Sequence, residues 1–125
     1  MNQSNSRTRK VELIDYVTLD GSVIRELMHP TLHTVRNQSL AEAIVESGGR
    51  TALHKHLQTE EIYHITRGRG LMTLGVDQFE VVEGDSIVIA PGTPHCIENI
   101  AIDGSPLRLL CCCAPAYSHQ DTVLL

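Results

Sequence analysis

The chain contains no tryptophan, and aromatic residues make up only 3% of its 125 residues. It has no apolar run near the roughly eighteen residues that a membrane-spanning helix needs, so we expect no membrane partner. Acidic residues outnumber basic ones, 15 against 10, and the formal net charge is -5. Because a negative chain is repelled by phosphate backbones, nucleic acid is not an expected partner either.

Spaced cysteine pairs are also missing. The four cysteines are Cys96 and the consecutive residues Cys111, Cys112 and Cys113, whereas thiolate metal sites usually use pairs such as C-x-x-C. Three adjacent cysteines cannot all reach good disulfide geometry. Unpaired thiols persist best in a reducing compartment, so we expect a cytoplasmic protein. An apolar stretch leads straight into the run, which favours a buried strand over a soft-metal site.

The first ten residues are polar and basic, with no apolar segment behind them. This composition predicts a disordered tail over residues 1–10 rather than a secretory signal. Residues 11–125 have the length of one domain with its own core. The segment 114–125 retains Pro115, Tyr117 and an apolar end, so we expect it to pack on the domain or on a second subunit.

Glycine and proline interrupt the rest of the chain at short intervals, and runs rich in Val, Ile, Leu, Thr and Tyr lie between them. This pattern is typical of a β-barrel or β-sandwich. A helix is hard to place, because 32–46 lacks a sustained 3.6-residue stripe and a strand fits its second half at least as well. We therefore expect an all-β domain with strands over 23–27, 41–45, 51–56, 62–66, 71–74, 79–82, 86–89, 96–100 and 107–113.

Two histidines separated by one residue are the most informative feature of the sequence. Side chains alternate along a strand, so His54 and His56 share one face, roughly 6.5–7 Å apart along the strand, which lets both imidazoles close on one ion. In the next strand either Glu61 or its neighbour Glu60 shares the inner face. His95 opens a later strand, after a turn that contains Pro and Gly. Three imidazoles and one carboxylate predict a divalent metal site.

These residues fall into two patterns that resemble the motifs of the cupin family. Residues 48–68 read G-x5-H-x-H-x4-E-x6-G and match the first motif, and residues 84–99 read G-x7-G-x2-H-x3-N and match the second with one departure. The proline of the second motif is expected at Ala90 and stands instead at Pro91. Because proline mainly pre-sets the turn, this shift leaves the ligand positions unaffected.

The resemblance implies a double-stranded β-helix, or jelly-roll, barrel of the cupin type. It assigns His54, His56, Glu61 and His95 as the ligands of one divalent transition metal and favours Glu61 over Glu60. Such a ligand set suits manganese, iron, nickel, zinc or copper. Glu61, if bound through one oxygen only, is also the candidate catalytic group for moving protons.

A six-coordinate ion with four protein ligands keeps two adjacent positions open for a small ligand. Tyr63, Asn99 and Met72 are expected to line the pocket there, although Met72 is first of all a core residue. The leading hypothesis is a metal-dependent enzyme acting on a small polar metabolite as an isomerase, oxygenase, decarboxylase or lyase. The alternatives are a binding or sensing module without turnover, and a structural metal site sealed by Met and Leu.

Two further expectations concern the surroundings of the site. A polar interior without metal is the competing interpretation of the four inward groups, but each group would then need a hydrogen-bond partner or lose hydration at a cost. The apolar C-terminal segment and open strand edges predict a homodimer. The remaining histidines are assigned to loops, an outward face and the tail: His29, His33, His64 and His119.

Overall fold

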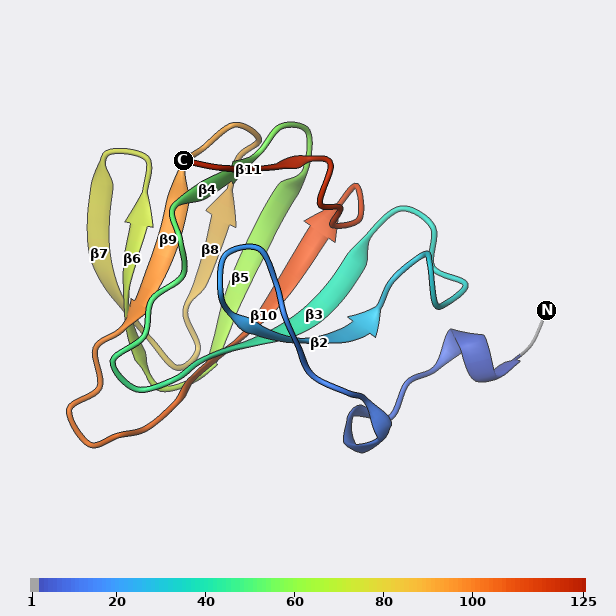
Figure 1. Ribbon diagram of the computed structural model, residues 1–125, viewed down its shortest axis with the longest axis horizontal. Coiled ribbons are helices and arrows are strands. Elements are labelled where there is room, and N and C mark those ends of the chain that lie inside the picture. Colours follow the sequence, from blue (N-terminus) through green and yellow to red (C-terminus); the bar gives the residue numbers. More distant parts are fainter. Residues whose placement is uncertain (1–2) are drawn as a thin grey trace.

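The computed structural model describes residues 3–125, which form two antiparallel sheets facing each other (Figure 1). The larger sheet has the order β1-β2-β3-β10-β5-β8, with strands over Tyr16–Val17, Val23–Met28, Ser39–Val45, Leu107–Ala114, Glu60–Arg67 and Ser86–Ile89. The smaller sheet has the order β11-β4-β9-β6-β7, with strands over Thr122–Leu124, His54–His56, His95–Asn99, Arg69–Leu74 and Asp77–Val82. The chain crosses repeatedly between the sheets, which confirms the all-β, double-stranded β-helix expectation.

All nine predicted strands are present, one of them, over 86–89, with the predicted ends and the other eight with shifted ends. The largest difference is in the strand predicted over 51–56, of which only His54–His56 pairs as a strand. The backbone N–H of Thr51 donates to the carbonyl of Ile97, but the returning Ile97 N–H donates to the hydroxyl of Thr51. A side-chain oxygen therefore replaces the backbone partner that would have extended the strand. The strand predicted over 96–100 begins and ends one residue earlier, at His95–Asn99.

Two short strands were not predicted. β1 has only two residues, and β11 has three and lies in the C-terminal segment. Both are edge strands, and β11 pairs with β4 so that Thr122 lies opposite His56. The expectation that the C-terminal segment packs on the domain is therefore confirmed.

The hydrophobic core fills one half of the space between the sheets. Ile65, Met72, Ile97, Leu107 and Leu109 are each at most 1% exposed. Along β10 the inward positions change from leucine to cysteine, and the pairing places Cys111 opposite Tyr63 and Cys113 opposite Glu61. The second half of the interior contains the buried polar side chains of the predicted site.

The N-terminal residues that the structure describes contain two short 3-10 turns, Gln3–Ser6 and Lys10–Glu12. The Thr8 hydroxyl donates to the carbonyl of Leu27, and Lys10 forms an ion pair of 2.9 Å with the buried Glu42. Residues 1 and 2 of the predicted tail lie outside the described residues. Disorder over residues 1–10 stays a prediction. No helix among the described residues has the length and apolar character required to cross a membrane.

Candidate metal centre

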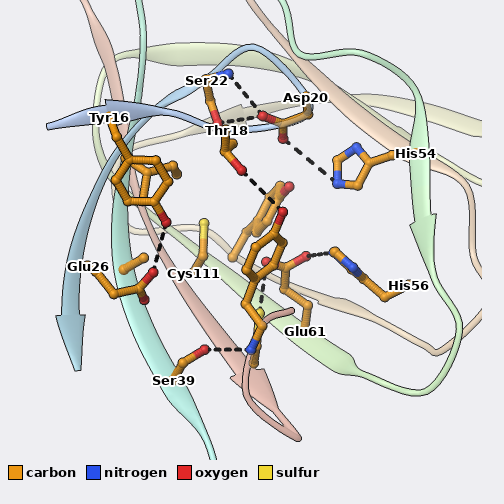
Figure 2. A pocket seen from close by; sticks show the side chains of 15 residues that line it. Tyr16, Thr18, Asp20, Ser22, Glu26, Ser39, His54, His56, Glu61 and Cys111 are labelled. Carbon is orange, nitrogen blue, oxygen red and sulfur yellow. Dashed lines mark hydrogen bonds and ion pairs between the residues drawn. The ribbon is translucent and has the colours of Figure 1, made fainter. Parts of the chain in front are cut away.

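Three strands bring the four predicted ligands together. β4 carries His54 and His56, β5 carries Glu61, and β9 carries His95. All four residues are at most 4% exposed, because strand alternation turns their side chains into the barrel. One ligand atom from each residue lies within 4.8 Å of every other. Figure 2 shows His54, His56 and Glu61 around the cavity beside this cluster.

The polar atoms at the centre of the cluster are not satisfied by the protein. Glu61 Oε1 lies 3.2 Å from His56 Nε2 and 3.3 Å from His95 Nε2. Nevertheless, Glu61 Oε1 and His95 Nε2 are buried without a properly oriented hydrogen-bond partner among the described residues. An unsatisfied buried polar atom costs about 1–3 kcal/mol. A divalent cation between these atoms would satisfy both, so the residues fit a metal ion.

The second nitrogen of each imidazole is held by the chain itself. His54 Nδ1 lies 2.8 Å from the carbonyl of Ala52, and His95 Nδ1 lies 2.9 Å from the carbonyl of Thr93. Carbonyl oxygens only accept, so both Nδ1 atoms carry the proton and both Nε2 atoms present a lone pair to the centre. This second-sphere arrangement is the one expected of metal-binding histidines.

His56 is oriented by a residue from the C-terminal strand. Its Nδ1 lies 3.0 Å from the hydroxyl of Thr122, and that hydroxyl donates in turn to the carbonyl of Ser118 at 2.9 Å. Because the Thr122 proton is used in this second bond, the hydroxyl accepts from His56 Nδ1–H. His56 Nε2 therefore faces the centre with a lone pair, like the other two imidazoles.

The electrostatics of the cluster favour the protonation states that a metal requires. Burial acts to raise the pKa of Glu61, but its close contacts with His56 and His95 hold that pKa at about 2. Burial, followed by repulsion from His95, lowers the pKa of His54, against an opposing hydrogen bond to Ala52. An ionised carboxylate and a neutral imidazole are the ligand forms that bind metal.

A cavity of about 50 Å³ adjoins the cluster. Tyr63 lines it, as expected, but Asn99 and Met72 do not belong to its lining. Met72 is fully buried in the hydrophobic core. The Asn99 amide donates to the carbonyls of Val45 and Ser105, at 3.0 and 2.8 Å, and so fixes neighbouring loops. Asn99 and Met72 therefore lie away from this cavity, because inward orientation alone does not decide which half of the interior a residue reaches.

Sequence reasoning missed several cavity residues, among them Asp20. Asp20 Oδ2 lies 3.8 Å from His54 Nε2. Its other oxygen accepts from the backbone N–H and the hydroxyl of Ser22, at 2.9 and 2.6 Å. The only sequence signal is the Asp-Gly-Ser turn, which indicates a local backbone role and no site. The other missed lining residues are Tyr16, Thr18, Ser22, Ile24, Glu26, Ser39, Ala41, Cys111, Cys113 and Tyr117.

The cysteine run lies in β10, as the apolar-strand interpretation predicts, and all four cysteines are free. Cys111 and Cys113 face the cavity, and Cys113 Sγ lies 3.3 Å from Glu61 Oε2. Burial raises the pKa of both thiols. The protonated Cys113 thiol therefore donates to the carboxylate oxygen that points away from the histidines.

The other histidines lie outside the cluster, as expected. His64 Nδ1 contacts the Ser86 hydroxyl at 2.7 Å from the outer face of β5. His29 Nε2 lies 2.8 Å from the carbonyl of Tyr117, and His119 Nδ1 lies 3.0 Å from the Tyr117 hydroxyl. His33 Nδ1 accepts the backbone N–H of His29 at 3.0 Å.

Comparison with known proteins agrees with this geometry. A family model described as a cupin domain matches residues 41–113. An uncharacterized protein of Methanocaldococcus jannaschii is 55% identical over 119 residues, which cover 95% of this chain and 94% of the relative.

Two solved structures show the same fold at low identity. A variant of the oxalate decarboxylase of Bacillus subtilis has a TM-score of 0.81 at 20% identity, covering 97% of this chain and 32% of that chain. An RmlC-like cupin from Shewanella frigidimarina has a TM-score of 0.75 at 12% identity, covering 90% and 92%. This chain thus spans about a third of the oxalate decarboxylase, and both likenesses concern the fold alone. With the family model matching more than half of its residues, the chain belongs to the cupin family.

Proposed function

We propose that this cupin is a metal-dependent enzyme acting on a small polar metabolite. The observation that carries the proposal is the buried convergence of three imidazole nitrogens and one carboxylate oxygen, two of them without a protein partner. A structural metal would be sealed by apolar side chains. Here the cluster adjoins a cavity whose lining includes the polar side chains of Asp20, Glu26 and Tyr63.

His54, His56, Glu61 and His95 would hold the ion, which we infer to be manganese, iron, nickel, zinc or copper. When bound, such an ion supplies Lewis-acid polarisation or redox chemistry to a ligand in the cavity. Glu61 Oε2 already accepts a hydrogen bond from Cys113, so Glu61 would bind the ion through Oε1. Oε2 then remains the oxygen that could exchange a proton.

Tyr63 is a hydroxyl donor that lies two residues after Glu61, on the same face of β5. Burial, followed by the charge of Glu61, raises the pKa of Tyr63 well above its ordinary value. The phenol therefore stays protonated and can donate a hydrogen bond to a bound molecule. Its place in the cavity wall gives it a positioning role.

The test combines binding with turnover. Metal-loaded protein is screened against small polar metabolites by melting temperature, and each stabilising compound is then followed by NMR for consumption. We expect at least one compound to stabilise the metal-loaded protein and to be converted by it. The same compound should stabilise neither the metal-free protein nor a His95→Ala variant. Binding without conversion would favour a sensing module, and a full screen without any metal-dependent shift would favour a structural ion.

A further inference from the structure

The cavity walls combine acidic and aromatic chemistry. Apart from the metal-binding residues, the charged side chains in the lining are Asp20 and Glu26. Three tyrosines, Tyr16, Tyr63 and Tyr117, contribute to the same wall. Within residues 3–125, no lysine or arginine lines this cavity. Figure 2 shows Asp20 above the site and Glu26 at its side, with Tyr16 against Glu26.

The cationic residues on the strands beside the cavity are directed to the other face of the sheet. Arg25 lies between the lining residues Ile24 and Glu26 in β2, so alternation turns it outward, where it pairs with Asp15. Arg108 forms an ion pair of 3.5 Å with the outward-facing Glu42. These guanidinium groups are therefore engaged and cannot neutralise an anion in the cavity.

One carboxylate oxygen of Glu26 has no hydrogen-bond donor among the described residues. Its Oε2 accepts the Tyr16 hydroxyl at 3.0 Å. Its Oε1 is buried and finds no hydrogen-bond partner among the described residues. Burial is the largest cause that raises the pKa of Glu26, against the Tyr16 hydrogen bond and the nearby His29 and His33, which act to lower it. A donor placed in the cavity would remove the cost of this unsatisfied oxygen.

Asp20 offers a second acceptor. Ser22 occupies Asp20 Oδ1, whereas Oδ2 lies 3.8 Å from His54 Nε2, beyond hydrogen-bonding distance. A ligand on the ion would therefore meet the carboxylate oxygens of Asp20 and Glu26 in the cavity lining. A hydroxyl or ammonium group makes favourable hydrogen bonds there, whereas a second carboxylate is repelled.

From these contacts, and resting on the metal-dependent function proposed above, we propose that the cavity takes a small amine or polyol without a carboxylate group. One lone pair of the ligand faces the ion, and its N–H or O–H donors face Glu26 and Asp20. The cavity, of about 50 Å³, favours a small ligand. A dicarboxylate such as oxalate, the substrate class named for one structural neighbour, does not match these walls.

The test uses three-carbon probes of matched size. Protein loaded with manganese(II), nickel(II) or zinc(II) is titrated by calorimetry with serinol, glycerol, malonate and, in addition, oxalate. Metal content is measured before and after each titration, so that removal of the ion by the dicarboxylates is detected. We expect serinol or glycerol to bind at least about tenfold more tightly than malonate or oxalate, the ratio corresponding to one charge-assisted hydrogen bond.

Glu26→Gln separates the two donor classes because it retains the shape of the side chain and removes its charge. We expect it to weaken serinol about tenfold and glycerol much less, with unchanged metal content. Glu83→Gln, at an exposed position, is the matched control and should change neither. Serinol binding lost in Glu26→Gln supports the amine, and tight glycerol binding unaffected by it supports the polyol.

Two results would overturn the inference. The first is tighter binding of malonate or oxalate than of serinol and glycerol to protein that keeps its ion. The second is retention of the ion with no binding of any of the four probes. Either result would contradict the ligand class and leave the proposed metal-dependent function in place. Failure to load any metal would instead contradict the metal-dependent function itself.

Discussion

At the scale of single residues, the site depends on which atom each side chain turns to the centre. Ala52, Thr93 and Thr122 hold the Nδ1 atoms of the three histidines, and the Nε2 atoms are thereby directed inward. The histidines and Glu61 could be predicted from strand alternation and motif spacing. Thr122 could not, because it meets His56 across 66 residues and no local pattern marks that contact.

His56→Ala should lower the affinity for manganese or zinc by more than about 100-fold, since loss of a second-sphere partner alone costs 10–100-fold. His64→Ala should leave the affinity unchanged, because His64 contacts Ser86 on the outer face. Competition titration with a metal-sensitive dye measures both. The reverse order of effects would show that the assignment of inward and outward faces is wrong.

Thr122→Val should weaken metal binding about tenfold, because His56 loses the acceptor that fixes its tautomer. Thr73→Val makes the same chemical change at a half-buried position away from the site, where the hydroxyl accepts from Gln78. That control should retain the affinity of the unmodified protein. Equal metal affinity in both variants would remove Thr122 from the support of the site.

At the scale of elements, alternating short strands and turn residues were enough to place nine strands. β1 and β11 were missed because two or three residues are too few for a period-two pattern. The strand predicted over 51–56 was too long because the Thr51 hydroxyl competes for a backbone partner, which strand propensity does not register. The cavity residues Tyr16, Thr18, Asp20 and Ser22, from the segment before β2, could not be predicted because they belong to no recognised sequence motif.

The turn between β5 and β6 makes a sharp prediction about stability. Gly68 has φ +91, and a Cβ there would lie 2.6 Å from the carbonyl oxygen of Pro106. Gly84 has φ +95 with nothing within 4 Å of such a Cβ. Gly84→Ala should therefore cost about 1–2 kcal/mol from backbone strain alone, and Gly68→Ala about 3 kcal/mol or more.

Urea denaturation of the two variants measures this difference in the free energy of unfolding. Both substitutions add the same methyl group at a positive φ, so the strain is matched and the backbone contact at Pro106 is the variable. A Gly68→Ala variant as stable as Gly84→Ala would mean that the β5–β6 turn moves freely away from the loop before β10.

At the scale of the whole molecule, the interior is divided between a hydrophobic half and a polar half with the cavity. The predicted cytoplasmic location and homodimer remain predictions. The C-terminal segment, on which the dimer was first argued, pairs with β4 of its own chain. Among the exposed apolar residues, Val11, Ile14 and Val17 near the N-terminus are 91%, 88% and 70% exposed.

Such side chains favour association with a second copy. Light scattering at micromolar concentration should therefore give about twice the chain mass of 13.8 kDa. Replacing Val11 and Ile14 together by glutamate should shift the protein toward the monomer, with metal content unchanged. A monomer in the unmodified protein at that concentration would contradict the dimer.

The measurement that tests the central claim most directly is the metal content of the protein as purified from its native host or after reloading. Mass spectrometry of the elements, after removal of loosely bound ions by dialysis, should find close to one divalent transition metal per chain. The same measurement on a His54→Ala, His95→Ala double variant should find almost none. Metal-free protein that takes up no manganese, iron, nickel, zinc or copper, or a double variant that retains a full ion, would contradict the account.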